Sequence, residues 1–433
     1  MSKTIRKCVP KNQAPYLTAL VPAVMASTSL SLHATGFDAP DQDAFAVARG
    51  MAVVATADNP SAIYYNPAGI TQLPGDNVRA GVYGIYLDPT YQPPGSSTTF
   101  DNQKKLHAIP ELFYTHGFTN LPVSLGLGLY TPFGLSEKWP QNTGFRTVAT
   151  QGSLTEYTIN PVAAFQLPWH ISLAAGLMVN YSSVNLQQGL TPVPNNDLFA
   201  FKGDAWALGY NLGARWEPLE QLSLGASFRS STTMDYSGHT ETQSSAPVPP
   251  FPAAPDTDSP ASVNFPFPLE ANVGVSFRPT KQWNVEFDAQ YTDWSALGNL
   301  TIHQTPAATS LVQSPTVPLS LDWESSWDFE WGVTRYFDNG WRLSAGYIFN
   351  ENSVPNAHYT PLVSDLDRHF FSVGTGYQGK HFNFDVAYQF GYGPDHTVVG
   401  SPTPTGYPPG YHPADGTYAF ISHAIMLSVG WRL

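Results

Sequence analysis

The feature that most constrains this chain is an alternation of apolar and polar residues that recurs in segment after segment. In Trp283–Tyr291 every second residue is apolar or aromatic, and the residues between them are Asn, Glu, Asp and Gln. Trp341–Phe349, Phe382–Phe390 and Ile425–Leu433 repeat the pattern. A period of two places one face of an extended strand in an apolar medium and the other face in a polar or packed one. The chain is therefore predicted to be all-β.

Fourteen such segments can be marked, and the connections between them differ in length in a regular way. The segments lie near 77–87, 105–118, 122–131, 153–167, 169–187, 201–217, 220–236, 267–279, 281–294, 323–336, 340–350, 367–378, 381–392 and 418–433. Connections of one to three residues alternate without a break with long ones at 88–104, 132–152, 188–200, 237–266, 295–322, 351–366 and 393–417. An outer-membrane barrel has tight periplasmic turns and long outer loops, whereas a secreted β-sandwich has no reason to sort its loops by length. The pattern favours a 14-stranded antiparallel transmembrane β-barrel (77–433) in a Gram-negative outer membrane.

Composition agrees with a barrel that has exposed outer loops. Only 12% of residues are charged, about half the usual share for a soluble domain. Tryptophans fall near the predicted strand ends, as interfacial girdles require: Trp139, Trp169, Trp216, Trp283, Trp294, Trp341 and Trp431. The stretches 241–268 and 401–413 are rich in Pro, Ser and Thr and are predicted to lie outside the sheet.

The first 34 residues are predicted to be a secretory signal. A basic start with Lys3, Arg6, Lys7 and Lys11 precedes a mostly apolar stretch, and Ala34 is a plausible cleavage position. The alternative, a membrane-anchor helix, is disfavoured because the stretch is short and contains Pro22 and several Ser and Thr residues. No later stretch is long and apolar enough for a transmembrane helix.

Charge and motifs exclude several classes of function. Cleavage after residue 34 leaves 16 basic and 33 acidic side chains and no cysteine, so neither a nucleic-acid-binding surface nor a disulfide is expected. We find no Gly-x-Ser-x-Gly elbow, no His-Glu-x-x-His motif and no histidine spacing typical of a metal site. We therefore expect no enzyme activity, no cofactor and no metal.

Residues 35–76 do not alternate and precede the first predicted strand. Ala44–Ala57 is rich in alanine and helix-compatible, and the sequence Asn66-Pro67-Ala68-Gly69 follows. A segment of about 40 residues at the periplasmic end of a barrel can hang free or fold into the lumen. Its small and aromatic residues suit a packed plug, which implies a selective channel and not an open pore.

This N-terminal segment resembles the hatch of the FadL/TodX family of long-chain fatty acid and hydrocarbon transporters. The resemblance rests on "TADNPSAIYYNPAGITQL", which includes Asn66-Pro67-Ala68, and continues in "DAQYTDWSAL" (288–297) and in Trp327–Tyr392. It covers the hatch (35–76) and the last third of the barrel well, and the middle loosely. It implies a hatch-plugged barrel of 14 strands that takes up hydrophobic molecules passively and acts as a monomer.

In the resembled family the ligand leaves sideways into the bilayer through a gap made by a kinked third strand. Here the third strand contains Gly126 and Gly128 and is followed by Pro132 and Gly134. Proline cannot donate to a strand ladder, and glycine permits a kink. The resemblance therefore implies a lateral gate near Gly126–Gly134, although Pro132 is equally consistent with a strand that simply ends at the outer rim.

The resemblance also suggests roles for residues of the hatch and of the twelfth strand. Phe37 is expected near the lumen pocket, with ordinary plug packing as the alternative. Asn66, Pro67, Ala68 and Gly69 are expected to shape the hatch turn, because Asn caps turns and Pro fixes φ. A structural salt bridge inside the barrel is expected at the start of the twelfth strand, among Asp365, Asp367 and Arg368.

One departure bears on the ligand. Members that carry fatty acids place basic side chains near the carboxylate, but here no Lys or Arg occurs from Thr147 through Phe201 or from Gln282 through Thr334. A buried carboxylate without a cation would be costly. The sequence therefore favours neutral hydrocarbons, unless the loops supply Arg or Lys.

The other expectations concern rival functions and partners. A general diffusion porin is the main alternative, and an outer-membrane lipid hydrolase is a weaker one. Expected partners are a hydrophobic small-molecule ligand, outer-membrane lipid and lipopolysaccharide, and the barrel-insertion machinery during assembly.

Overall fold

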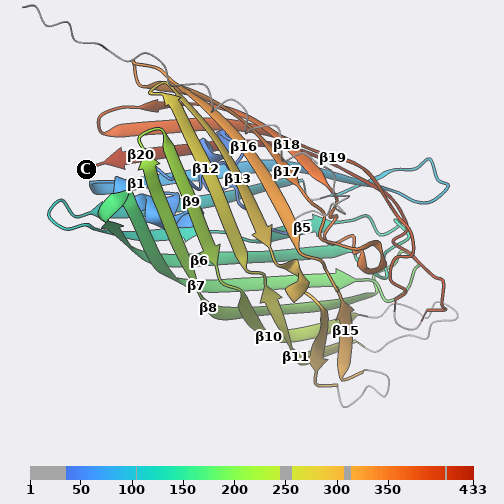
Figure 1. Ribbon diagram of the computed structural model, residues 1–433. Coiled ribbons are helices and arrows are strands. Elements are labelled where there is room, and N and C mark those ends of the chain that lie inside the picture. Colours follow the sequence, from blue (N-terminus) through green and yellow to red (C-terminus); the bar gives the residue numbers. More distant parts are fainter. Residues whose placement is uncertain (1–35, 104, 244–255, 307–313, 405–406) are drawn as a thin grey trace, which may run out of the picture. The chain divides into compact units, whose positions relative to one another are not determined.

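In a computed structural model, the described residues form one antiparallel sheet that closes on itself (Figure 1). The structure describes residues 36–103, 105–243, 256–306, 314–404 and 407–433. The predicted signal peptide (1–34) lies outside the described residues. Closure follows from the pairing of β1 (Gly75–Gln92), which bonds to β3 (Leu106–Gly117) on one side and to β20 (Gly416–Arg432) on the other.

Fourteen strands of the described chain make up the ring, and this confirms the predicted barrel. From β3 the ring continues through β4 (Val123–Tyr130), β6 (Gln151–Leu167), β7 (Ile171–Gln188), β8 (Leu198–Leu219), β9 (Leu222–Arg229), β12 (Glu270–Thr280) and β13 (Trp283–Thr292). It returns to β20 through β16 (Ser326–Tyr336), β17 (Trp341–Asn350), β18 (Arg368–Gln378) and β19 (Phe382–Val398). Each of these strands falls on a segment marked by the alternation.

The wall continues beyond the predicted strands at the end that carries the long loops (Figure 1). Short strands prolong the ring there: β5 (Gly134–Lys138), β10 (Thr232–Gln243), β11 (Thr257–Phe267), β14 (Asn299–Gln304) and β15 (Thr316–Ser320), with β2 (Phe100–Asp101) beside β1. The prediction that 241–268 stays outside the sheet was therefore wrong for the end of β10 and for β11, and residues 244–255 lie outside the described residues. Val263, Phe265 and Phe267 supply an apolar inward face that outweighs the Pro and Ser content of β11.

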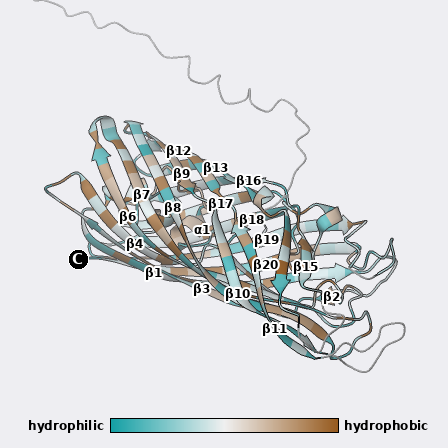
Figure 2. Cartoon of the chain, turned by 90° about the horizontal axis from the view of Figure 1, so that it is seen from below, coloured by the Kyte–Doolittle hydropathy of each residue, from teal (hydrophilic) through white to brown (hydrophobic). Residues whose placement is uncertain are grey.

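Hydrophobic residues recur along the strands (Figure 2), and the large apolar side chains that are exposed make the outer face of the barrel apolar. Side chains such as Val273, Phe277 and Ile425 are half-exposed there, whereas their strand neighbours point inward. Five of the seven tryptophans predicted to lie at strand ends, at residues 169, 216, 283, 341 and 431, are exposed beside the short turns. Trp139 and Trp294 are fully buried and belong to the interior, which corrects their assignment to a girdle. None of the described helices is long and apolar enough to span a membrane.

Residues 36–74, called here the N-terminal segment, are enclosed by the ring. The segment holds α1 (Ala44–Ala48), α2 (Ala62–Tyr65) and the 3₁₀ helix η1 (Pro67–Gln72), and nearly all of its side chains are buried. Its helices contact strands all around the ring, from β3, β4, β6, β7 and β8 to β17, β18, β19 and β20. Asp43 caps α1 by accepting hydrogen bonds from the amides of Phe45 and Ala46. A segment in contact with opposite walls fills the space between them.

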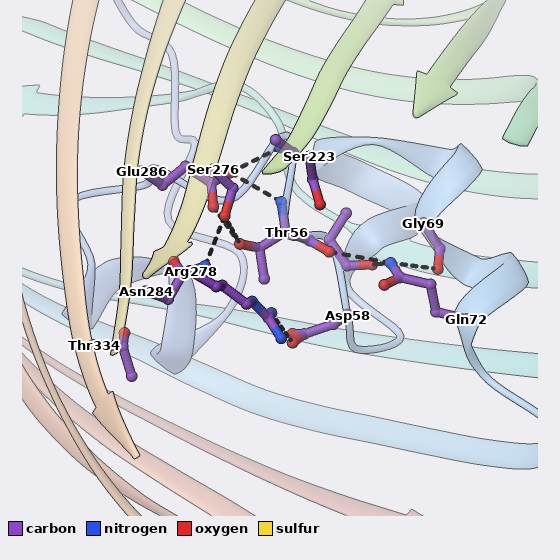
Figure 3. Close-up of polar contacts among 12 residues, drawn as sticks. Thr56, Asp58, Gly69, Gln72, Ser223, Ser276, Arg278, Asn284, Glu286 and Thr334 are labelled. Atoms are coloured by element: carbon purple, nitrogen blue, oxygen red, sulfur yellow. Dashed lines mark hydrogen bonds and ion pairs between the residues drawn. The ribbon is translucent and has the colours of Figure 1, made fainter. Parts of the chain in front are cut away.

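Polar bonds to β12 and β13 hold the turn at residues 55–58 (Figure 3). The Glu286 carboxylate accepts from the backbone amides of Ala55 at 2.8 Å and Thr56 at 3.0 Å, and it pairs with Arg49 at 3.0 Å. The Arg278 guanidinium reaches the Asp58 carboxylate at 3.3 Å. The bonds of Glu286 satisfy a charge and backbone groups that are buried away from water, whereas the Arg278–Asp58 pair is partly exposed.

Glycines in the wall let the backbone of the segment come close. A Cβ atom at Gly346 of β17 would lie 2.0 Å from the Gly50 amide nitrogen, and one at Gly225 of β9 would lie 2.3 Å from the Val54 carbonyl oxygen. Neither approach is compatible with a side chain. The wall and the segment are thus fitted to each other at the backbone level.

Candidate lateral opening and lumen cavity

The wall strand that follows β3 is interrupted after Tyr130. β4 pairs with both β3 and β6 over its length, and its continuation β5 pairs with β6 only. On the side opposite β1, Leu106–Glu111 of β3 has no ladder partner among the described residues. The interruption covers Thr131–Phe133 and contains Pro132, which has no amide hydrogen to give to a ladder.

The interrupted backbone bonds to the N-terminal segment instead of to β3. The Ala39 amide donates to the Pro132 carbonyl at 2.8 Å, and the Gly134 amide donates to the Phe37 carbonyl at 3.0 Å. Asp38 and Phe133 form an isolated antiparallel bridge between these two bonds. The chain at 131–134 is therefore drawn toward the interior and leaves β3 without its neighbour.

The resulting window in the wall is bounded at both ends. Below it, β3 and β4 pair from Leu112↔Leu129 to Gly117↔Ser124. Above it, the Gln103 amide donates to the Lys138 carbonyl at 2.7 Å, which rejoins the loop before β3 to the end of β5. The window thus spans about six residues of β3.

A cavity of about 330 Å³ lies behind the window. His107–Pro110 of β3 and Leu135–Glu137 of β5, on the two sides of the window, both line it. Residues 36–41 of the N-terminal segment form its floor, and Phe37 is among them. The cavity therefore lies between the N-terminal segment and the two strands that border the window.

Carboxyl groups dominate the charged lining of this cavity. Asp38, Asp41, Glu137, Asp328 and Glu330 line it, against one guanidinium, that of Arg368. Burial raises the pKa of Asp41 to about 7, despite the hydrogen bond that its carboxylate accepts from the Gln389 amide at 3.2 Å. Burial, followed by the charge of Glu270, likewise raises the pKa of Asp38. The remaining lining is largely apolar, with side chains such as Ile85, Leu154, Ile348 and Phe420.

An aromatic cluster adjoins the cavity and holds Phe37. The Phe37 ring lies 4.7 Å from the Trp294 ring and 5.9 Å from the Phe133 ring, centroid to centroid, both edge to face. Phe265, Phe267 and Trp323 surround it at similar distances. Phe37 therefore lines the cavity and is also packed, so the two alternatives for this residue do not exclude each other.

The residues predicted for the gate are divided by the structure. Gly134 lines the cavity, and Pro132 lies in the interruption. Gly126 and Gly128 are fully paired within β4, below the window, and their α-carbons face Ile63 of the N-terminal segment. The interruption of the wall therefore covers a shorter stretch of the chain than the predicted range Gly126–Gly134.

The residues predicted for the hatch turn lie away from the cavity. Asn66 caps η1 through a hydrogen bond accepted from the Ala68 amide at 3.2 Å, and Pro67 occupies the first helical position. The Asn66 amide donates to the carbonyls of Val54 at 2.8 Å and Ala214 at 3.0 Å. A Cβ atom at Gly69 would lie 2.2 Å from the Ala57 carbonyl oxygen.

The acidic–arginine sequence before β18 lies above the cavity. Asp365 pairs with Arg368 at 3.5 Å and accepts from the Gly36 amide at 3.1 Å, so it also holds the start of the N-terminal segment. Asp367 accepts from the Asn352 amide at 3.0 Å.

Sequence reasoning missed the buried charges that join the N-terminal segment to the wall. Arg79 of β1 pairs with Asp43 and, at 2.8 Å, with Asp385 of β19, which also pairs with Arg342 of β17 at 2.7 Å. A signal was present for Arg79, Arg342 and Asp385, because each falls on the polar phase of an alternating strand. Asp43 had no such signal, because it lies in the segment that does not alternate. The partners are more than 300 residues apart for Arg79 and Asp385, so no local pattern could pair them.

The chain matches a family model over residues 24–404, and that family is described as outer membrane protein transport protein (OMPP1/FadL/TodX). The chain belongs to this family. FadL/TodX-family proteins transport fatty acids and hydrocarbons across the outer membrane, and this chain is accordingly an outer-membrane, multi-pass transport protein and not an enzyme.

Relatives of this FadL/TodX-family protein agree in length and fold. It is 22% identical over 368 residues to the long-chain fatty acid transport protein of Salmonella typhi, covering 78% of this chain and 81% of that protein. Its fold matches that of a Pseudomonas aeruginosa FadL homologue with a TM-score of 0.77 at 18% identity, covering 92% of this chain and 100% of that one. The Ralstonia pickettii toluene transporter TbuX matches with a TM-score of 0.68 at 16% identity, covering 90% and 98%.

Proposed function

We propose that this protein takes up uncharged hydrophobic molecules, such as aromatic or aliphatic hydrocarbons, and releases them sideways into the outer membrane. The observation that carries the proposal is the cavity behind the window between β3 and β5, lined from both sides of that window. Uptake would be passive, and the protein would act as a monomer within outer-membrane lipid and lipopolysaccharide after assembly by the barrel-insertion machinery.

The window supports lateral release on energetic grounds. Backbone groups facing hydrocarbon without partners are costly, so membrane barrels normally keep every wall strand paired. Here part of that pairing is given up at one place, and the N-terminal segment satisfies the displaced backbone there. A hydrophobic molecule that leaves through this place never enters the periplasmic water as a free species.

The charges of the cavity support a ligand without a carboxylate. Five carboxyl groups line the cavity, and its one guanidinium is already paired with Asp365. The scarcity of Lys and Arg noted in the sequence is thus also found in the lining of the cavity. A fatty acid carboxylate placed there would be desolvated among groups of its own sign.

The proposal is tested by uptake in cells that lack their own hydrophobic transporters. Cells expressing the protein receive a labelled long-chain fatty acid or labelled toluene in parallel. We expect faster entry of toluene than in the empty strain and little change for the fatty acid. Uptake of the fatty acid alone would overturn the ligand assignment, and entry of neither would overturn the transport assignment.

The route is tested in the same cells by Gly134→Trp. A Cβ atom at Gly134 meets no other atom within 4 Å, so the indole fills the cavity beside the window without straining the fold. We expect toluene uptake to fall by about tenfold or more, a loss of transport equivalent to at least about 1.4 kcal/mol. Gly84→Trp is the matched control, because it adds the same bulk on an exposed position of β1. Unchanged uptake in a well-assembled Gly134→Trp protein would rule out this route.

A further inference from the structure

One part of the cavity wall combines a buried acid without a partner and other acids close to it. Glu330 of β16 lines the cavity and is 6% exposed. Among the described residues, none forms a hydrogen bond or ion pair with its carboxylate, and the charges that act on it are those of other carboxyl groups. A buried carboxylate is normally paired or hydrogen-bonded, because losing water without compensation is costly. Its place in the cavity wall indicates that the compensating group comes from a ligand.

Four carboxyl groups act electrostatically on Glu330, and two of them, Asp328 and Asp38, also line the cavity. Asp328 precedes it by two residues and faces the same side of β16, and Asp38 of the N-terminal segment acts on both electrostatically. The Asp328 carboxylate accepts one hydrogen bond, from the Asn350 amide at 2.7 Å. One oxygen of Asp38 accepts from the Gln290 amide at 3.1 Å, and its other oxygen is buried without a partner. Carboxylate oxygens that could accept further hydrogen bonds are thus gathered in one part of the cavity wall.

No cation in the described part of the chain pairs directly with this cluster, although the charge of Arg229, which is paired with Glu270, acts on Asp38. Arg368 is the one arginine or lysine among the residues lining the cavity, and it is engaged by Asp365 at 3.5 Å and by the Ser364 carbonyl at 3.1 Å. Its guanidinium also lies over the Phe420 ring, 4.6 Å from the ring centroid. No ion pair joins Asp38, Asp328 or Glu330 to a cation anywhere in the described ranges.

We propose that the cavity binds hydrophobic amines, with the protonated nitrogen held between Glu330, Asp328 and Asp38 and the hydrocarbon tail against the apolar wall. An ammonium group has three donors and a positive charge, which match the acceptors left open there. The tail would lie along Ile85, Leu154 and Ile348, toward the window. This inference rests on the proposed uptake of hydrophobic molecules and extends it from uncharged ligands to ligands with a cationic head group.

The test compares three probes with the same tail and different heads: n-octylamine, 1-octanol and octanoate. Binding to the purified full-length barrel in lipid nanodiscs is measured by calorimetry at about pH 7.5, where a primary amine is protonated. We expect octylamine to bind at least about tenfold more tightly than octanol, as for a charge-assisted hydrogen bond, and octanoate to bind most weakly. In Glu330→Gln the amine preference should shrink about tenfold, with octanol binding unchanged.

Controls separate the head-group effect from damage to the fold. Glu220→Gln makes the same chemical change on the exposed turn between β8 and β9 and should leave the amine preference intact. Asp38→Asn serves as a second cluster variant if Glu330→Gln assembles poorly. Equal binding of amine and octanol by the unmodified protein, or an unchanged preference in both cluster variants, would overturn the inference while leaving hydrophobic uptake standing. Binding of none of the probes, together with no toluene uptake in cells, would overturn the proposed function itself.

Discussion

Asp41 is a single carboxyl group through which pH can act on the N-terminal segment. Its pKa is raised by burial from 3.8 to about 7, so between these values the folded segment binds a proton that the unfolded chain has released. Stability of the segment therefore falls as pH rises through this window, and the full cost of burying the charge is present above about pH 7. Asp41→Asn should remove this pH dependence and stabilise the segment at neutral pH.

Hydrogen exchange of the backbone around residues 37–45, corrected for the intrinsic effect of pH, measures this change. In the unmodified protein exchange should be faster at about pH 8 than at about pH 5, and in Asp41→Asn the two should agree. Asp395→Asn changes an exposed aspartate on β19 and is the control. Equal exchange at both pH values in the unmodified protein would contradict the prediction.

The sequence also indicated that Asp328 and Glu330 point inward, but not that Asp38 lies near them. Asp328 and Glu330 occupy the polar phase of β16, so their inward direction could be inferred from the alternation. Asp38 comes from a segment without alternation, almost 300 residues away, and nothing local indicates which wall it faces. Phe37 was expected at the lumen pocket by resemblance, whereas its contact with Trp294 depends on how η3 (Trp294–Ala296) folds back into the interior.

Among the elements, strands were predictable wherever one face meets lipid. A lipid-facing side must be apolar at every second residue, and this requirement is visible in a single sequence. Where the wall extends beyond the membrane, strands do not need an apolar residue at every second position. The sequences of β11, β14 and β15 were therefore interpreted as loops. The third strand had a partial signal in Pro132, but the bonds from Phe37 and Ala39 that draw it inward have no local signature.

The fit between the N-terminal segment and the wall can be disturbed from the wall side. Gly346→Val would place side-chain atoms against the backbone of Gly50, and overpacking of this kind costs about 1–3 kcal/mol. We expect faster hydrogen exchange across residues 44–57, with β17 itself still protected. Gly84→Val is the control, because the nearest atom to its Cβ is the Ile425 carbonyl oxygen at 3.6 Å. Unchanged exchange at 44–57 would show that the segment tolerates a shift at this point.

For the whole molecule, the filled interior distinguishes a transporter from a diffusion porin. A second cavity, of about 350 Å³, lies by the short turns and shares no lining residue with the first in the described chain. Buried ion pairs such as Arg49–Glu286 and Arg79–Asp43 join the N-terminal segment to the wall, and Arg79 also lines the second cavity. In planar lipid bilayers we therefore expect little steady current from the unmodified protein.

Breaking those pairs should raise the current. Removing one partner of a buried ion pair costs about 3–5 kcal/mol, so the double variant Arg49→Ala, Arg79→Ala should loosen the segment and show frequent openings. Retained heat-modifiable mobility in gels would confirm that the barrel still closes. A large steady current from the unmodified protein would instead favour the porin alternative.

The bonds of Asp43 and Ala44 lie at the seam where the first and last strands meet. Asp43 pairs with Arg79 of β1, and the Ala44 amide donates to Ser428 of β20 at 2.9 Å, while β1 and β20 pair with each other along nearly their whole length. The first and last strands of the ring thus share interior partners in the N-terminal segment, which precedes both of them in the chain. We infer that the barrel closes with the N-terminal segment already inside it. Insertion into the membrane and blocking of the lumen would then occur together, and no open pore would form in the outer membrane during assembly.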